Sequence, residues 1–399
     1  MLFKKILSIS SFIKLSAAGI LMAFVIFFQS CENDPKDLGI NYIPSIDTTG
    51  IKFLDSQADT MNITSGSFKH YINNYLAENL LIGKFQEFDS KALIRFYEIT
   101  PDYDSAEVLS AVLTFRYGGY YFKEKGGNTS FNVNKILSVL NFNSITYDSV
   151  NSSQISAESY GSFNGVVPDS SDIAITLDNQ LIKDWLEYAA DTSYPVKNYG
   201  LALVPTSAST TIKGFFLINN NVDFIPVIDI ILRKNGETDT IKLNTSDGLS
   251  LSDAPSSIIP SERIYTQNGI AYRSIMNFDL NKLPGNVIIN NATLQFTLDK
   301  ANSFISENTD KRIVLGLITD SVTKKDTLYT DAFPSDSIVY SVNINSIIQR
   351  WNSGVYPNMG ISMKNYFELQ NLDYFVFYSP NDPDISKRPR LKITYTLRN

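Results

Sequence analysis

Residues that carry nucleophilic or metal chemistry are scarce in this sequence. Histidine occurs once, at His70, and cysteine once, at Cys31. Most Ser-His-Asp and Cys-His arrangements are therefore excluded unless His70 itself serves, and a zinc site built from several histidines is impossible. The motifs of phosphate loops, zinc proteases and serine hydrolases are also missing. We therefore expect no catalytic residue, no metal and no cofactor, and predict that the protein is not an enzyme.

Carboxylates leave two alternatives open. A glycosidase needs a pair of Asp or Glu residues, but here these residues are scattered in turns, where hydrogen bonds to the local backbone account for them. The acidic turn at residues 379–389 could bind calcium through Asp382 and Asp384. It lacks the regular spacing of a calcium loop, so a plain turn is the favoured interpretation.

The best candidate for ligand binding is an aromatic segment at residues 115–127, FRYGGYYFKEKGG. Tyr117, Tyr120, Tyr121 and Phe122 cluster there around a Gly-Gly pair. Aromatic rings can stack on the apolar faces of sugars, and tyrosine adds a hydroxyl group for hydrogen bonding. The alternative, which we favour, is a strand that bends at the glycines and turns these rings into the core.

The N-terminus has the three parts of a secretory signal. Early lysines precede an apolar run at residues 15–28, which is shorter than the roughly 20 residues that span a bilayer. The sequence FQSC at residues 28–31 resembles a relaxed lipobox. We therefore predict a signal peptide at residues 1–30, a lipid on Cys31 and a flexible tether over residues 31–50.

The predicted lipid anchor makes the membrane a partner and the outer membrane the expected location, on the cell-surface or periplasmic face. Glu32, Asp34 and Asp37 resemble the signal that directs lipoproteins of Bacteroidota to the cell surface, and a solvated linker is the alternative. The formal net charge is −7, and basic residues form no cluster. Nucleic acid is therefore not an expected partner.

Beyond the tether, the sequence predicts β-structure that repeats once. Short alternating or apolar runs rich in Ile, Val, Phe, Tyr and Thr are separated by turn-forming clusters. Helical periodicity is brief, at residues 177–189 and 342–351. Five landmarks recur in order: residues 93–96, 110–115, Trp185, 198–204 and 227–232 in the first copy, and residues 274–280, 291–296, Trp351, 358–363 and 390–395 in the second.

This repeat predicts an all-β fold of two tandem antiparallel β-sandwiches, jelly-roll-like, with one short helix in each. We expect the tryptophan of each helix to pack against its own sandwich. The turn signal Asn235-Gly236 and the polar stretch up to Ser257 place the boundary between about residues 235 and 257. The predicted domains are residues 51–235 and 236–399.

The second copy resembles a known type of domain. Residues 273–298 look like the opening of DNRLRE-type domains, and residues 347–364 are similar to a later block of that group. The resemblance implies a jelly-roll sandwich of bacterial surface proteins, some of which bind polysaccharide. It fades in the first copy, where Glu98 stands in place of Asp279. The matching residues of the opening are Arg273, Phe278, Asp279, Leu280, Leu283, Pro284, Ala292 and Leu294.

Over nearly its full length, the chain also resembles a Bacteroidota outer-membrane lipoprotein family of unknown function. The resemblance implies location and fold and carries no mechanism with it. Besides the paired sandwich, it rests on a C-x-x-D-P-x-x-L-G start formed by Cys31, Asp34, Pro35, Leu38 and Gly39.

A second kind of modification is suggested by a short recurring pattern. Bacteroidota attach glycans to Ser or Thr in a pattern that resembles D-[ST]-[AILVMT], although turns also enrich Asp-Ser and Asp-Thr. The candidate O-glycosylation sites are Thr48, Thr60, Ser105, Ser149, Thr240, Ser321, Thr327 and Ser337.

These observations rank three hypotheses. The first is a non-catalytic, outer-membrane-anchored lipoprotein whose β-sandwiches bind a polysaccharide or an envelope protein. The second is an accessory or structural subunit of an envelope complex that docks through strand edges. The third is a glycan-active enzyme, a hydrolase or a lyase.

Overall fold

The computed structural model describes residues 50–398, except residues 60, 76 and 219–221. The predicted signal peptide, nearly all of the tether, Cys31, Thr48 and Thr60 lie outside the described residues. The described chain is all-β, as predicted, with two large antiparallel sheets and two α-helices. Each sheet curls into a sandwich, and both sandwiches belong to one compact unit at residues 53–399.

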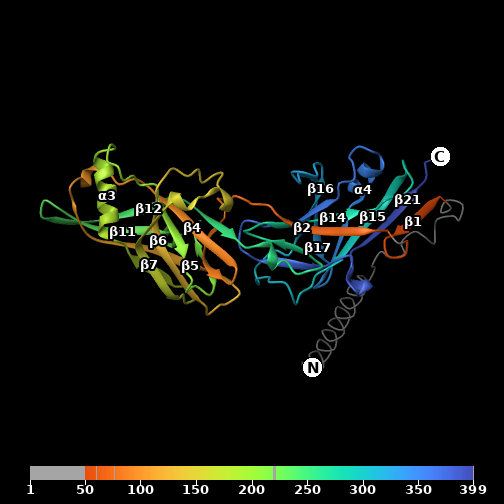
Figure 1. Cartoon of the computed structure of the whole chain (residues 1–399), viewed down its shortest axis with the longest axis horizontal. Helices are drawn as coiled ribbons and strands as arrows, with labels where there is room; N and C mark the ends of the chain where they lie inside the picture. The colour runs from red at the N-terminus through yellow and green to blue at the C-terminus, as the bar shows by residue number, and fades with distance from the viewer. Residues whose placement is uncertain (1–49, 60, 76, 219–221, 399) are drawn as a thin grey trace, which may run out of the picture. The chain divides into compact units, whose positions relative to one another are not determined.

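The first sandwich contains ten strands and one helix (Figure 1). Its elements are β3 Asn79–Phe85, β4 Phe88–Phe96, β5 Glu107–Phe122, β6 Asn128–Ile136, β7 Ile155–Val166, β8 Asp172–Thr176, α3 Asn179–Ala190, β9 Leu201–Pro205, β10 Ile212–Phe216, β11 Val227–Lys234 and β12 Glu237–Asp253.

The second sandwich contains eleven strands and one helix, and two of its strands come from the start of the described chain. Its elements are β1 Ile51–Asp55, β2 Ile63–Lys69, β13 Arg263–Gln267, β14 Tyr272–Phe278, β15 Ile288–Thr297, β16 Ile313–Ile318, β17 Asp326–Pro334, β18 Val339–Asn343, α4 Asn345–Asn352, β19 Ile361–Asn365, β20 Tyr374–Tyr378 and β21 Arg390–Thr396.

The two sandwiches share one pairing scheme. In the first, β4 pairs with β9, and β5 pairs with β8 and β11. In the second, β14 pairs with β19, and β15 pairs with β18 and β21. The strands that carry the repeated sequence landmarks therefore occupy equivalent positions in the two sheets.

The helix of each sandwich also packs in the same way. Trp185 in α3 lies 6.3 Å from Phe96, ring centre to ring centre, at 38°. Trp351 in α4 lies 6.3 Å from Phe278 at 39°. Both indoles are buried in the core of their own sandwich, as predicted, because the apolar side chains of each helix lie on one face.

The turn that enters the strand after each helix repeats as well. The backbone N–H of Gly200 donates to Asn198 Oδ1 at 3.2 Å, and that of Gly360 donates to Asn358 Oδ1 at 3.3 Å. Both glycines have a positive φ, of 101° and 92°. A Cβ at either position would collide with the backbone of the paired strand, so glycine is required there.

Strand pairing places the boundary between the domains after Asp253, within the predicted range of residues 235–257 but not at Asn235. Asn235 and Gly236 form the tight turn of a hairpin in which β12 continues the first sheet by pairing with β11. The second half of β12 then pairs with β4, so the first sandwich extends to Asp253. The turn signal was correct, but it marks a hairpin inside one sheet instead of a domain boundary.

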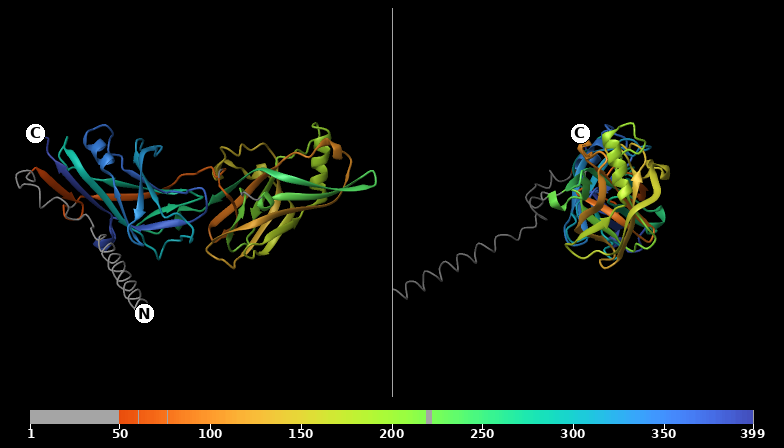
Figure 2. Two further views of the ribbon diagram at one scale, coloured as in Figure 1. Left: turned by 180° about the vertical axis from the view of Figure 1, so that it is seen from behind. Right: turned by 90° about the vertical axis from the view of Figure 1, so that its left-hand side faces the viewer.

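The first strands of the described chain complete the other sandwich. β2 pairs along its whole length with β14 and lies among the strands of the second sandwich (Figures 1 and 2). Next to β1, the backbone N–H of Ser56 donates to the carbonyl oxygen of Leu391 in β21, and the N–H of Leu391 donates to the Ser56 hydroxyl. The predicted first domain therefore loses residues 51–69 to the second sandwich.

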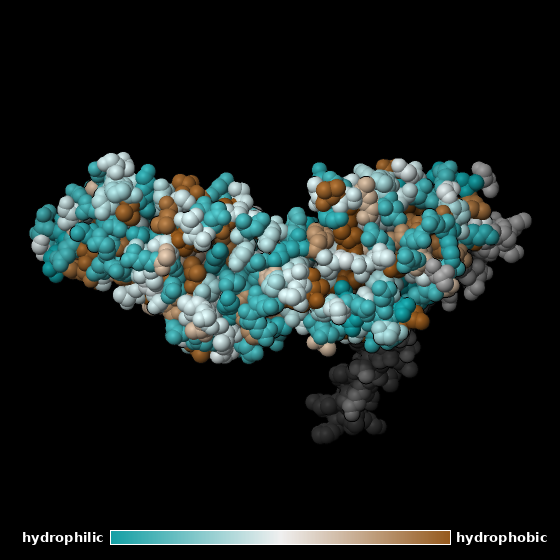
Figure 3. All heavy atoms as spheres, viewed as in Figure 1, coloured by the Kyte–Doolittle hydropathy of each residue, from teal (hydrophilic) through white to brown (hydrophobic). Residues whose placement is uncertain are grey.

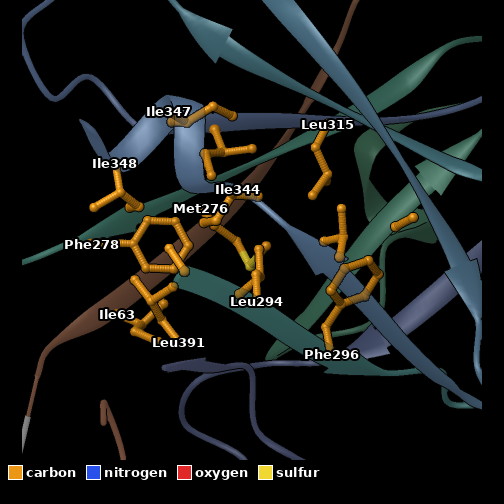
Figure 4. Packing of buried hydrophobic residues seen from close by; sticks show 14 of the residues in the cluster. Ile63, Met276, Phe278, Leu294, Phe296, Leu315, Ile344, Ile347, Ile348 and Leu391 are labelled. Atoms are coloured by element: carbon orange, nitrogen blue, oxygen red, sulfur yellow. The ribbon is translucent and has the colours of Figure 1, made fainter. Parts of the chain in front are cut away.

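Two large hydrophobic clusters stabilise the sandwiches. Figure 4 shows the cluster of the second sandwich, in which Ile63 from β2 lies with Phe278, Leu294 and Leu391 from three other strands. Full burial of each such side chain contributes about 1.5–3 kcal/mol. Residues 51–69 therefore belong to the second sandwich through their core as well as through their hydrogen bonds.

Candidate functional site

The aromatic segment forms the far end of the long strand β5. From Val112 to Arg116 this strand pairs with β8, and from Tyr117 to Phe122 it pairs with β10. The partner changes just before the Gly-Gly pair, and the pairing with β10 is irregular between Tyr117 and Tyr121, where Gly119 has a φ of 88°. The strand therefore bends at the glycines, and its last residues extend toward the second sandwich.

A cleft of about 860 Å³ opens beside this bend. One wall comes from the first sandwich and includes the end of β5, Phe216 and Phe224. The other wall comes from the second sandwich and consists of the loop at residues 304–309 and Asn371. A cleft of this size, with aromatic and polar lining, matches the usual dimensions of a small-ligand site.

Aromatic side chains form one wall of the cleft. Phe216 and Phe224 stack with ring centres 5.9 Å apart at 18°. The guanidinium of Arg116 lies over Phe224 at 4.0 Å and forms two hydrogen bonds with Asp172, at 2.6 and 2.8 Å. The wall is therefore a flat apolar surface with a fixed charged edge, which suits stacking of a ring that also carries polar groups.

The four aromatic residues singled out in the sequence divide between two roles. Tyr121 is half-buried and Tyr117 is 2% exposed, and both line the cleft. Tyr120 also lines the cleft, but its hydroxyl accepts from the N–H of Leu372 at 3.0 Å, which ties the two sandwiches together. Phe122 does not line the cleft, because its fully buried ring packs against Phe304 at the junction.

A buried lysine lies behind the two tyrosines. Lys213 of β10 has no exposed surface, and its Nζ lies 4.9 Å from the ring centre of Tyr117 and 5.4 Å from that of Tyr121. Its Nζ donates to the carbonyl oxygen of Lys125 at 2.5 Å. Within the described chain it forms no ion pair. Burial lowers the pKa of Lys213, because the charged ammonium is poorly solvated there.

The hydroxyl of Tyr117 is a second unusual group in this region, and its side chain belongs to the core of the first sandwich. This oxygen is buried and has no hydrogen-bond partner among the described residues. Burial raises the pKa of Tyr117, so the hydroxyl keeps its proton and can donate. Buried polar atoms without a partner are rare in proteins.

Asp373 fixes the opposite wall of the cleft. Its buried carboxylate accepts from the backbone N–H of Ser306 at 2.7 Å, from the Ser306 hydroxyl at 2.9 Å and from the Thr309 hydroxyl. It also accepts from the Tyr120 hydroxyl at 3.2 Å. Burial raises the pKa of Asp373, although these hydrogen bonds oppose the shift. One carboxylate thus holds both the loop and the junction.

Lys213, Asp373 and Phe304 were not predicted from the sequence. Lys213 had a usable signal, since it lies within the apolar run Ile212–Phe216 and a lysine in such a run must be buried or displaced. Asp373 and Phe304 gave no local signal, because their importance comes from contacts with β5, about 250 and about 180 residues away, respectively.

The other residues that the sequence singled out for catalysis or metal binding do not line the cleft. His70 is exposed. Asp382 accepts from Arg263 Nη1 at 3.0 Å, and Asp384 pairs with Lys387 at 3.3 Å, so both carboxylates already have cationic partners. Over the described residues, no group of three or more His, Cys, Asp and Glu side chains is arranged to hold a metal ion.

The candidate glycosylation sites that the structure describes lie at the surface. Thr327 is half-buried in β17, and the other five are exposed. Their accessibility is compatible with modification, which stays a prediction. The exposed sites are Ser105, Ser149, Thr240, Ser321 and Ser337.

No protein-family model, curated protein or solved structure matches this chain. The resemblances noted in the sequence therefore stay predictions. In the part of the chain that the structure describes, no helix is long and apolar enough to cross a membrane. On the face drawn in Figure 3, hydrophobic residues form separate patches among hydrophilic ones.

Proposed function

We propose that this protein is a non-catalytic, lipid-anchored binding protein of the outer membrane, with its ligand site in the cleft beside β5. The proposed ligand is a segment of polysaccharide. The lipid anchor rests on the predicted signal peptide and Cys31. The binding role rests on the cleft, where aromatic rings and hydrogen-bonding groups lie together.

One observation carries this proposal: half-buried Tyr121, Phe216 and Phe224 line a cleft whose other wall presents hydroxyl and amide groups. Sugars have apolar ring faces and polar edges, and this combination satisfies both. The groups of the opposite wall are held in place by Asp373, so little ordering is needed when a ligand binds.

The test is calorimetric titration of the full chain with a panel of oligosaccharides. Tyr121→Ala should weaken binding about tenfold, because it removes an aromatic stacking surface. Tyr329→Ala is the matched control, since Tyr329 is a 54% exposed tyrosine on β17 that does not line the cleft. Equal affinities of the native chain and the Tyr121 variant for every bound sugar would contradict the proposal.

A second candidate function is that of an accessory subunit of an envelope complex. It is favoured by the edge strand β7, whose twelve residues pair only with β6 within the described chain. An unpaired strand edge can accept a strand from a partner protein. Affinity purification from gently solubilised envelopes tests this role, and a partner at equal stoichiometry would favour it over polysaccharide binding.

A further inference from the structure

A second group of aromatic side chains is exposed on the second sandwich. Phe333 lies in β17, and Tyr366 and Phe367 directly follow β19. Their exposed fractions are 55%, 40% and 47%, respectively. Single exposed apolar side chains are ordinary, whereas several that gather in one place mark an interaction surface. We call these three rings and Arg312 the outer patch.

Arg312 connects the three rings of the outer patch. Its guanidinium lies 3.3 Å from the ring centre of Tyr366 and 5.9 Å from that of Phe333. The rings of Tyr366 and Phe367 are perpendicular, with centres 4.7 Å apart at 78°. The backbone N–H of Tyr366 also donates to the carbonyl oxygen of Arg312 at 3.2 Å. The four residues therefore form one continuous surface.

The charge of Arg312 is neutralised within the protein. Asp310 accepts hydrogen bonds from Arg312 Nε at 2.8 Å and from Nη2 at 2.5 Å, and Asp331 lies 3.7 Å from Nη1. Two carboxylates balance one cation, so Arg312 itself does not favour an acidic ligand. They also hold the guanidinium, and with it the ring of Tyr366, in place before a ligand binds. The outer patch thus suits a neutral ligand with apolar faces, and sugars have such faces.

The outer patch begins where the wall of the cleft ends. Thr309 lines the cleft, and Arg312 follows three residues later, which limits the distance between their Cα atoms to about 11 Å. Asn371 also lines the cleft and lies four residues after Phe367, at most about 14 Å away. The side-chain amide of Asn371 donates to the Thr309 hydroxyl at 3.1 Å, which joins the two segments at the cleft wall. The outer patch is therefore within reach of a ligand chain that leaves the cleft on this side.

We propose that the outer patch forms additional glycan subsites, which bind the continuation of the polysaccharide chain held in the cleft. This inference rests on the proposed glycan-binding function and extends it to the length of the ligand. Sugar units in the cleft stack on Tyr121, Phe216 and Phe224. Units farther along the same chain stack on Phe333 and Phe367. Because both contacts belong to one ligand chain, the second is an intramolecular event and adds to the affinity of the first.

The experiment measures affinity against ligand length by calorimetric titration of the full chain. Neutral oligomers of glucose, of mannose and of galactose are each used from the disaccharide upward. In a series that binds, long oligomers should bind the native chain about tenfold more tightly than the shortest oligomer that binds, since an aromatic contact contributes up to about that much. Phe367→Ala should remove most of this gain and leave the affinity for the shortest oligomer unchanged.

Further variants separate the outer patch from the cleft and from the fold. Phe53→Ala is the matched control, because Phe53 is a 66% exposed phenylalanine on β1, which pairs with β21 and lies outside the outer patch. It should change the affinity at no length. Phe333→Ala should reduce the gain by itself, and both patch variants should unfold at the native temperature because their rings are about half exposed. Tyr121→Ala, in contrast, should weaken binding at every length.

The outcomes distinguish this inference from the proposed function. Affinity that does not rise with length would confine the ligand to the cleft, which overturns the outer patch as a subsite and leaves glycan binding standing. A gain with length that survives both Phe367→Ala and Phe333→Ala would also overturn it. Loss of a co-purified envelope protein in these variants, with oligosaccharide affinities unchanged, would assign the patch to a protein partner instead. Absence of binding in every series and in the wider panel would overturn both proposals.

Discussion

The two sandwiches are built on one plan but differ at one strand. Strand β5 of the first is 16 residues long, whereas its counterpart β15 in the second has 10 and ends at Thr297. The additional length begins near the Gly-Gly pair and carries Tyr120 to Phe122 into the junction. Shared strands and a shared helix provide the scaffold, and the cleft comes from the extension that only one copy has.

The sandwiches also differ in the origin of the strand that closes them. In the first, β12 follows directly from β11 and then pairs with β4. In the second, the equivalent partners β21 and β14 are covered by β1 and β2 from the start of the described chain. One copy is therefore closed by a local hairpin, and the other by a segment that lies about 207 residues from its partner β14 and about 335 from its partner β21.

Removing residues 51–69 should have the largest effect on this comparison. The second sandwich would lose three buried apolar side chains, Leu54, Met61 and Ile63, which corresponds to about 6 kcal/mol of its free energy of unfolding. The first sandwich keeps β12 and should stay folded. Limited proteolysis and thermal unfolding test this, with a chain that begins at Gly50 as control. Equal loss of both sandwiches would mean that neither folds independently.

Substitution of either tryptophan should lower the stability of the protein by a similar amount. Trp185→Ala and Trp351→Ala should each lower the free energy of unfolding by about 3–5 kcal/mol, because each leaves a large cavity beside a phenylalanine. Chemical denaturation measures both values, and substitution by Phe should cost less in each case. A difference of more than about 2 kcal/mol between the alanine variants would show that the helices play unequal roles.

These tryptophans also show how much of the fold the sequence could predict. The Trp, Asn-x-Gly and strand landmarks recur because each fixes a local geometry that both copies need. The membership of residues 51–69 could not be predicted in this way, since nothing in their local pattern distinguishes a partner 200 residues away from a near one. Asp373 could not be predicted for the same reason. The bend at Gly118-Gly119 was part of the favoured interpretation of the aromatic segment, and the structure contains it.

Asp373→Ala tests the junction, which has no counterpart inside either sandwich. It should lower stability by about 2–3 kcal/mol, because Ser306, Thr309 and Tyr120 lose their shared acceptor. Asp373→Asn should cost less, since it keeps a carbonyl oxygen and removes a buried charge. Thermal unfolding measures both, and an alanine variant as stable as the native chain would refute the assigned role.

The smallest effect concerns acid stability at β1. Hydrogen bonds from Arg390 lower the pKa of Asp55 below its ordinary value of 3.8. The stabilisation by this pair is therefore complete above pH 3.8 and is lost as the pH falls through the lowered pKa. Asp55→Asn should flatten this part of the stability profile between about pH 4 and 2. An unchanged acid profile in the variant would show that the pair contributes nothing to closure of the second sandwich.

The most direct test of the cleft as a ligand site is hydrogen exchange of the full chain with and without a bound oligosaccharide, followed by mass spectrometry. Binding in the cleft predicts slower exchange in two segments far apart in sequence, residues 116–125 and 304–309, and little change along β15 and β18. Protection confined to other surfaces, such as the edge of β7, would contradict the cleft as the site.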